Sequence, residues 1–214
     1  MPGSYANIEK SYAAISPMRE RFSNLVLDCN SVFTAKSETT LLATLKHLAK
    51  AFRFDNMSVT YARGALQDEA LKKVSKERYR EINAFLESLE RRKESRFLYP
   101  LWRGARDVSR DMLMRTVFDD EFVVPCVAGR KLIVISETGE VYPCEILGRS
   151  MGNLREFDFD LKRLTETAKS RDLVKWIKDT KCKCSFECAL AANVVWNPST
   201  YPKLAVSAWR NIGK

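Results

Sequence analysis

Five of the six cysteines gather in one part of the chain, where their spacing could bind a metal centre. Two stand in the arrangement C-x12-G-x4-C around Gly139, and three form the run C-x-C-x3-C. These five are Cys126, Cys144, Cys182, Cys184 and Cys188. Five is an odd number for disulfide pairing, and a reducing compartment disfavours such bonds, so clustered thiols there are interpreted first as metal ligands. Soft thiolates in fours select zinc or iron–sulfur clusters, which leaves one of the five surplus.

A zinc ion that only stabilises a small domain is the simplest alternative. Zinc knuckles usually present two C-x2-C pairs, and neither cysteine group here has that spacing. Spacing alone therefore predicts a metal site and leaves zinc and iron–sulfur open.

Two further residues that could bind a metal are interpreted as structural. Cys29 lies in an apolar run and is predicted to be a small core residue. His47, beside Leu45 and Leu48, is predicted to be a surface or core-edge residue.

A β-hairpin is the element expected to bring the first two cysteines together. The segment KLIVIS-ETGE-VYPC contains two short apolar strands around a Thr138–Gly139 turn. Cys126 precedes the first strand and Cys144 closes the second, so the hairpin can bring their thiolates close. Helices are predicted over 105–118 and over the segment FDFDLKRLTETAKSRDLVKWIKDT, which precedes the other three cysteines.

The first part of the chain alternates helical and strand patterns. An initial helical pattern is interrupted by Pro17. Strands are predicted over 25–33 and 57–62, and amphipathic helices after an N-cap at Ser37 and over 75–92. This order predicts βαβ units and a parallel sheet. Because parallel sheets need both faces covered, the two strands are expected to join a sheet in another chain or to belong to a larger domain.

Composition limits the class of protein. The 214 residues are 45% hydrophobic and include 11 Phe, 7 Tyr and 4 Trp, too many for a disordered chain. No apolar run could span a bilayer and no signal-peptide pattern is visible, so a soluble, cytoplasmic protein is expected. The formal net charge of +9 favours acidic partners. The most basic stretch interleaves its cations with Glu, as exposed helices do, which leaves nucleic-acid binding as the alternative function.

The cysteine-containing stretches carry a resemblance to a known family. CVAGRKLIVISETGEVYPCEILGRSMGNLREFDFD, followed by CKCSFECALAANVVWNP, resembles the auxiliary-cluster domain of radical S-adenosylmethionine (radical SAM) enzymes, of the SPASM or shorter twitch type. The C-x12-G-x4-C arrangement and the MGNL step at 151–154 are similar to the family's hairpin and the GN(I/L) step after it. The C-x-C-x3-C run departs from the longer SPASM pattern, so the resemblance implies a single twitch-like [4Fe–4S] cluster. The ligands that it implies come from Cys126, Cys144, Cys182, Cys184 and Cys188.

The first part of the chain resembles the same family's barrel. GSYANIEKSYAAISPMRERFSNLVLDCNSVFTAKSE resembles a helix and strand after the middle of the barrel, and SVTYARG resembles a later strand. The resemblance implies an α/β fold, with the C-terminal part of a partial (β/α)6 TIM-like barrel over 1–117. A small α+β, cysteine-rich SPASM/twitch domain with a β-hairpin would follow over 118–214. Arg63, at the C-terminal end of a barrel strand, would bind substrate or S-adenosylmethionine.

One departure limits the activity that the resemblance implies. The family binds its catalytic cluster through C-x3-C-x2-C near the start of the barrel, and this sequence contains no such motif. We therefore expect a truncated product or split subunit that binds an auxiliary [4Fe–4S] cluster but does not cleave S-adenosylmethionine alone. Its partner would be a separate chain carrying the N-terminal half, and the substrate a peptide or a small molecule. The alternative is a zinc-stapled basic module that binds nucleic acid or protein.

Overall fold

The structure is a computed structural model that describes residues 3–89 and 99–212. Its helices and strands form a mixed α/β fold with two small sheets. The chain divides into two compact units. The first contains Met1–Ala62 and Asp68–Arg91, and the second contains Arg63–Gln67 and Arg92–Lys214. The predicted division after residue 117 lies later in the chain than this one, because the long helix before it packs on other helices of the second unit. As a statement about family domains it stays a prediction.

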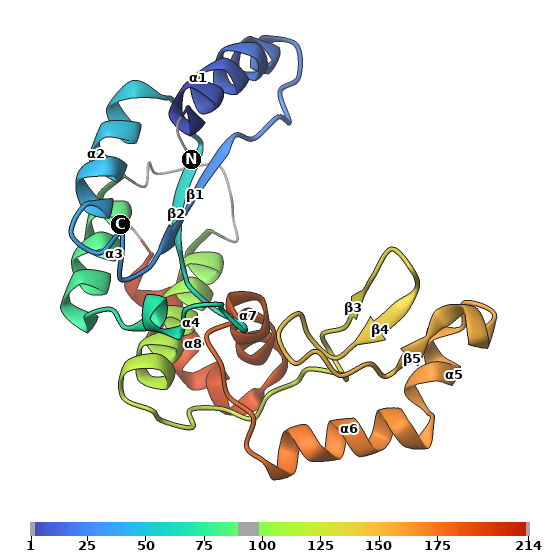
Figure 1. Cartoon of the computed structure of the whole chain (residues 1–214). Helices are drawn as coiled ribbons and strands as arrows, with labels where there is room; N and C mark the ends of the chain where they lie inside the picture. Colours follow the sequence, from blue (N-terminus) through green and yellow to red (C-terminus); the bar gives the residue numbers. More distant parts are fainter. Residues whose placement is uncertain (1–2, 90–98, 213–214) are drawn as a thin grey trace. The chain divides into compact units, whose positions relative to one another are not determined.

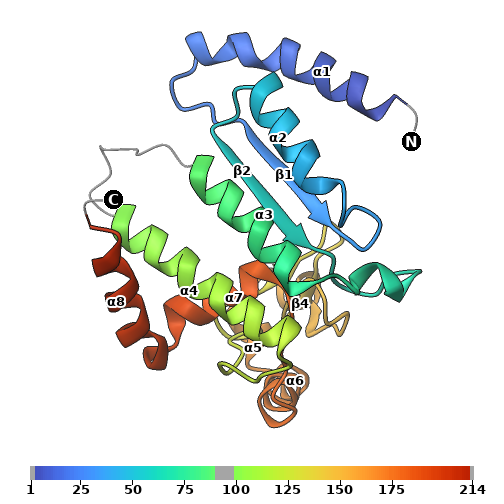
Figure 2. The same ribbon diagram turned by 90° about the vertical axis from the view of Figure 1, so that its left-hand side faces the viewer.

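The first unit is built on a two-stranded parallel sheet. Its strands are β1 (Asp28–Phe33) and β2 (Asn56–Tyr61), which pair in register along their whole length. The helix α2 (Leu41–Ala51) follows β1, and the 3-10 helix η2 (Glu69–Lys72) and the helix α3 (Lys76–Leu89) follow β2 (Figure 1, Figure 2). This order confirms the predicted succession of strand, helix, strand and helix, and the predicted parallel pairing.

The sheet has one covered face and one exposed face, because successive side chains of each strand point to opposite faces and only one face is covered. On the covered face Phe33 is fully buried and lies 6.0 Å, centroid to centroid, from the ring of Tyr79 on α3. On the exposed face Ser58 and Thr60 donate hydrogen bonds to Asn30 Oδ1. The buried apolar residues that α2 and α3 contribute to the core are Leu41, Leu45, Leu48, Tyr79, Ile82 and Leu86.

Helix α1 (Ser4–Ile15) ends just before Pro17, which confirms the predicted interruption, and the chain continues as the 3-10 helix η1 (Ser16–Glu20). The Tyr5 hydroxyl lies 2.8 Å from Nε2 of His47. His47 is exposed, in agreement with the prediction that it is a surface or core-edge residue.

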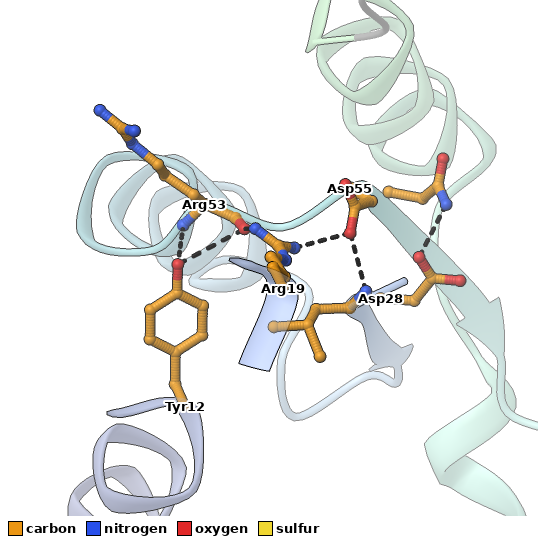
Figure 3. Close-up of polar contacts among 7 residues, drawn as sticks. Tyr12, Arg19, Asp28, Arg53 and Asp55 are labelled. Atoms are coloured by element: carbon orange, nitrogen blue, oxygen red, sulfur yellow. Dashed lines mark hydrogen bonds and ion pairs between the residues drawn. The ribbon is translucent and has the colours of Figure 1, made fainter. Parts of the chain in front are cut away.

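A polar network fixes the first helices to the loop before β2 (Figure 3). The Tyr12 hydroxyl accepts the backbone N–H of Arg53 at 2.8 Å. Arg19 donates to the Arg53 carbonyl oxygen at 2.7 Å and pairs with the Asp55 carboxylate at 2.6 Å. Asp55 also accepts the backbone N–H of Leu27 at 2.8 Å, so the network includes the chain just before β1.

The start of α2 differs from the prediction. Ser37 is predicted as the N-cap, but the N-cap position is Thr40 and the helix begins at Leu41. Ser37 Oγ instead accepts the backbone N–H of Thr34 at 3.0 Å, in the turn after β1. A serine hydroxyl can bond to the backbone of a turn as well as to a helix end, and here it bonds to the turn.

The second unit is mainly helical and contains a small antiparallel sheet. The sheet consists of β3 (Val134–Ile135), β4 (Glu140–Tyr142) and β5 (Gly152–Asn153). The α-helices are α4 (Tyr99–Phe118), α5 (Leu161–Thr165), α6 (Ala168–Asp179), α7 (Glu187–Trp196) and α8 (Tyr201–Arg210). The 3-10 helices are η3 (Leu154–Phe157) and η4 (Pro198–Thr200). The β3–β4 pair, turning at Gly139, confirms the predicted hairpin, and β5 adds a strand that the sequence pattern does not indicate.

The helix predicted between the hairpin and the last cysteines is divided into α5 and α6. Thr167 is the N-cap of α6, and its hydroxyl oxygen accepts the backbone N–H of Ser170 at 3.2 Å. On the helical side of the unit, α4 packs on α7 and α8. A Cβ at Gly104 would meet the backbone nitrogen of Ala208 at 2.7 Å, so the α4–α8 approach requires glycine. Among the described residues, no helix combines the length and apolar character that a membrane crossing needs.

Candidate metal centre

The loop after Cys126 is bound to the end of the hairpin that carries Cys144. The backbone N–H of Gly129 donates to the carbonyl oxygens of Leu132 at 2.8 Å and Pro143 at 3.2 Å. Gly129 has a φ of +76°, a left-handed conformation that glycine adopts without strain. Because Pro143 immediately precedes Cys144, this bond brings the two hairpin cysteines into one region.

The second cysteine segment connects α6 to α7. Lys181 has a left-handed backbone, with φ 48°, and turns the chain after α6. The N–H of Cys182 then donates to the carbonyl oxygen of Ile177 at 3.0 Å, which fixes this cysteine against the end of α6. Cys184 follows, and Phe186, only 3% exposed, anchors the start of α7 in the core.

Four cysteines from these two segments meet in one apolar cluster of the second unit. Cys144 is buried in it, and Cys126, Cys182 and Cys184 pack against it. The other buried members are Ala128, Ile177, Phe186 and Ala189. Cys126, Cys182 and Cys184 also line a small pocket that is partly open to solvent. Cysteines of a hairpin and of a segment some 40 positions later thus lie in the same small region.

Burial governs the acidity of the three thiols that line the pocket. It raises the pKa of Cys184 to about 11, and it also raises the pKa values of Cys126 and Cys182. A negative charge on Cys126 or Cys144 raises the pKa of Cys182 further, which means that these sulfurs lie within electrostatic range of one another. Without a nearby cation these three thiols are therefore protonated at neutral pH, and a bound metal centre would stabilise their thiolates.

Two backbone N–H groups act against the effect of burial on these thiols. The N–H of Ala128 lowers the pKa of Cys126, and the N–H of Phe186 lowers the pKa of Cys184, in each case by less than burial raises it. In both cases the N–H belongs to the residue two positions after the cysteine. A backbone N–H close to a thiol favours its thiolate form.

Two amide side chains fix the backbone around Cys126. Asn193 of α7 is 5% exposed, and its Oδ1 accepts the N–H of Val127 at 2.9 Å. Asn197 donates from Nδ2 to the carbonyl oxygen of Pro125 at 3.2 Å. Asn193 of α7 and Asn197, the residue after α7, thus hold the backbone on both sides of Cys126.

The fifth clustered cysteine lies apart from the other four. Cys188 is exposed, near the start of α7, and does not pack in the apolar cluster. Cys29 lies on β1 of the first unit, where it is half-buried and burial raises its pKa. The structure therefore brings together Cys126, Cys144, Cys182 and Cys184, and it does not bring Cys188 or Cys29 to them.

Arg63 belongs to the second unit and lies beside the apolar cluster. One guanidinium nitrogen is 2.6 Å from Oε2 of Glu187, and the other is 3.6 Å from Oε2 of Glu145. The guanidinium also lies over the ring of Phe186, 4.9 Å from its centroid. These partners adjoin Cys144 and Cys188 in the sequence, so Arg63 links the hairpin end to the start of α7. Its predicted role in binding S-adenosylmethionine or substrate stays a prediction.

Within residues 3–89 and 99–212, no three His, Cys, Asp or Glu side chains are arranged so that they could hold a metal ion as they stand. The four thiols share one apolar cluster, but their sulfur atoms do not surround a common coordination point in this structure.

Asn193 is a candidate site residue that cysteine spacing does not indicate. It lines the same pocket as the three thiols and is one of few buried polar residues of the second unit. The available signal is its position as a lone amide in the apolar segment ALAANVVW, since a buried amide needs hydrogen-bond partners.

Comparisons of this chain with family models, with curated proteins and with solved structures find no match. The family resemblance in the sequence therefore stays a prediction, and the functional argument depends on the site itself.

Proposed function

We propose that this chain binds one [4Fe–4S] cluster through four cysteine thiolates. The ligands are Cys126, Cys144, Cys182 and Cys184. The observation that carries the proposal is the convergence of these four thiols, from two distant segments, on one apolar cluster. The donor set fits the group, because four thiolates are the usual ligands of such clusters. The backbone N–H groups of Ala128 and Phe186 lower the pKa values of Cys126 and Cys184, which favours the thiolate form that a cluster needs.

We further propose that the chain is the auxiliary-cluster portion of a radical SAM enzyme of the SPASM or twitch type. The hairpin with its glycine turn and the succession β1–α2–β2–α3, which is the repeating unit of a (β/α) barrel, support this proposal. Because the sequence lacks C-x3-C-x2-C, activity on a peptide or small molecule would need a partner chain that carries this motif. Arg63, which follows β2, is the proposed contact to substrate or S-adenosylmethionine in such an assembly.

In this proposal the protein has three tasks at the site. When bound, the cluster would supply one-electron transfer. Phe186 and Ile177 pack in the apolar cluster with the thiols, the N–H groups of Ala128 and Phe186 favour two of the thiolates, and the guanidinium of Arg63 lies over the Phe186 ring. Burial, hydrogen bonds and nearby charge are the features by which a protein sets the potential of such a centre.

The test is reconstitution of the full chain with iron and sulfide without oxygen. We expect about four iron atoms per chain, absorbance near 400 nm, and a paramagnetic signal after reduction. Single serine replacements at the four proposed ligands should each lower the iron content at least twofold. Cys188→Ser is the matched control, because it removes a thiol only a few residues away from Cys184 that lies outside the apolar cluster.

Two outcomes would contradict the proposal. The first is a wild-type chain that takes up no iron. The second is loss of iron in Cys188→Ser with retention in one of the other four variants, because the ligand set would then be different. One equivalent of zinc with no iron would favour the alternative, a zinc-stapled module whose net charge of +9 binds nucleic acid or an acidic protein.

A further inference from the structure

Helix α8 turns polar residues towards the protein and apolar residues towards solvent. It packs on α4 (Figure 2), and small and polar residues make this contact. Asp107 Oδ2 accepts hydrogen bonds from Ser207 Oγ at 3.3 Å and from Asn211 Nδ2 at 2.9 Å. Ala208 lies against Gly104. A helix on the surface of a folded domain usually packs the other way round, with its apolar side on the core.

The outward side of α8 is an apolar stripe formed by Pro202, Val206 and Trp209. These residues are exposed and recur at intervals of four and three positions, which places them on one side of the helix. Val206 is 52% exposed and Trp209 is 77% exposed, the most of any large apolar side chain that the structure describes. Ile212, two residues after the helix, is 63% exposed. Exposed apolar residues that gather in this way indicate a surface that binds a partner or a membrane.

The charge beside this stripe is only positive. Lys203 and Arg210 are exposed, and α8 contains no acidic residue. Each follows a stripe residue by one position, so both cations lie along the same flank of the stripe. From 188 to 214 the sequence has three cations and no Asp or Glu. A helix with Trp on its apolar side and Lys and Arg beside it has the composition of helices that bind anionic membranes.

We propose that the outward side of α8 is a docking surface for an anionic phospholipid bilayer. Val206 and Trp209 enter the boundary between headgroups and acyl chains, and Lys203 and Arg210 bind lipid phosphates. The ten residues of α8 span about 15 Å, which is too short to cross a bilayer, so the helix lies along the surface. The inference is independent of the proposed function, because none of the proposed cluster ligands belongs to α8.

A second copy of this chain is the alternative occupant, and charge and size both disfavour it. A symmetric contact through α8 would bring Lys203 and Arg210 of both copies to one seam, where like charges repel. The outward side of a ten-residue helix is also far smaller than the ~800 Å² that each partner contributes to a stable interface. A bilayer supplies the opposite charge and needs no matching surface.

The test is co-sedimentation of the full chain with phospholipid vesicles at low salt. We expect binding to vesicles of equal parts phosphatidylglycerol and phosphatidylcholine, and about tenfold weaker binding to phosphatidylcholine alone. Binding to the anionic vesicles should weaken as salt is added, because salt screens the attraction of Lys203 and Arg210 to the lipid. No sedimentation with either kind of vesicle, or equal sedimentation with both, would overturn the inference.

Two variants separate the apolar stripe from the cations. Trp209→Ser should weaken binding about tenfold, because the exposed ring is the largest apolar group of the stripe. Replacement of Lys203 and Arg210 together by Gln should weaken binding by about the same factor and reduce its dependence on salt. Trp102→Ser is the matched control. Trp102 is 53% exposed and precedes Gly104 by two positions, so it lies on the side of α4 away from α8.

Circular dichroism checks that each variant keeps the wild-type fold, which is expected because the replaced side chains are exposed. Wild-type binding by Trp209→Ser, or a loss of binding in Trp102→Ser as large as that in Trp209→Ser, would overturn the inference. Sedimentation velocity without lipid tests the alternative occupant. A wild-type dimer that Trp209→Ser abolishes would identify a second copy as the partner of the stripe and would also overturn the inference.

Discussion

Cys184 and Cys188 have different surroundings, so their reactivity with an alkylating reagent is expected to differ. Burial raises the pKa of Cys184 to about 11, whereas Cys188 is exposed. The thiolate is the nucleophile in alkylation, so its population decides the rate. In the metal-free protein at pH 8 we expect iodoacetamide to modify Cys188 at least tenfold faster than Cys184, measured by peptide mass spectrometry. Equal rates would contradict the raised pKa of Cys184.

The same shift makes stability depend on pH in a definite direction. The folded-state pKa of Cys184 lies above the ordinary value of 9.0, so the neutral thiol favours the folded state. Its contribution to the free energy of unfolding is therefore complete below about pH 9 and is lost as the pH rises through about 11. We expect the denaturation midpoint of the metal-free chain to fall over this range, and to fall less in Cys184→Ser. The same pH dependence in both proteins would contradict the assignment.

Arg63 illustrates what sequence can and cannot predict about a single residue. Its place after a strand predicts a contact to ligand, but its carboxylate partners, Glu145 and Glu187, lie far along the chain and no local pattern indicates them. We expect Arg63→Met to lower the free energy of unfolding by about 1 kcal/mol, through loss of the ion pairs and of the stack on Phe186. Arg63→Lys should lose less, because it keeps the charge. Denaturant unfolding measures both, and full wild-type stability in Arg63→Met would contradict the described contacts.

At the scale of elements, the contact of α4 with α8 depends on one missing side chain. The Cβ of an alanine at Gly104 would meet Ala208 N at 2.7 Å and Ala208 Cα at 3.0 Å. Alanine favours a helix by roughly 0.5–1 kcal/mol over glycine. Overpacking against backbone costs about 1–3 kcal/mol, so we expect Gly104→Ala to be destabilising in denaturant unfolding. Ala208→Gly should not rescue it, because the atoms in contact belong to the backbone. A stabilised Gly104→Ala would mean that the two helices are further apart.

The elements themselves were largely predictable, and the misses have local causes. The runs over 25–33 and 57–62 indicated β1 and β2 because strands are rich in β-branched and aromatic residues, although both strands alternate between exposed and covered positions and β1 begins only at Asp28. The two-residue strand β5 has no such run, since its pairing with β4 is set by the fold. The N-cap at Ser37 was wrong because the hydroxyl bonds to the turn at Thr34 instead. Thr167 caps the start of α6 and so separates it from α5. The helical pattern continues on both sides of Thr167, so periodicity does not indicate this boundary.

At the scale of the whole molecule, the absence of C-x3-C-x2-C from the sequence sets the expected limit of activity. Reconstituted chain mixed with S-adenosylmethionine and dithionite should release no more 5′-deoxyadenosine than a sample without protein, measured by liquid chromatography. The reason is chemical, because the four grouped thiols would all be occupied as ligands of one cluster. Release of 5′-deoxyadenosine by this chain alone, and its loss in the cysteine variants, would contradict the proposal that cleavage of S-adenosylmethionine needs a partner chain.

The candidate metal centre was predictable only as a set of five thiols. Cysteine spacing and a hairpin turn indicated which segments take part, because these are local features. The sequence could not tell which thiol is surplus, since the exposure of Cys188 depends on how the start of α7 is anchored by Phe186. Nor could it supply Asn193, because its bond to the backbone N–H of Val127, beside Cys126, depends on where α7 lies.

The path of the backbone between the two units has a consequence for how the protein can be taken apart. The polypeptide leaves the first unit at 62/63, returns at 67/68 and leaves again at 91/92. Cleavage between residues 91 and 92 would leave the first unit whole, but it would separate Arg63–Gln67 from the rest of the second unit. A fragment that begins at residue 92 would therefore lack the guanidinium that lies over Phe186. An isolated second unit that is to keep this contact must be made from two pieces of chain.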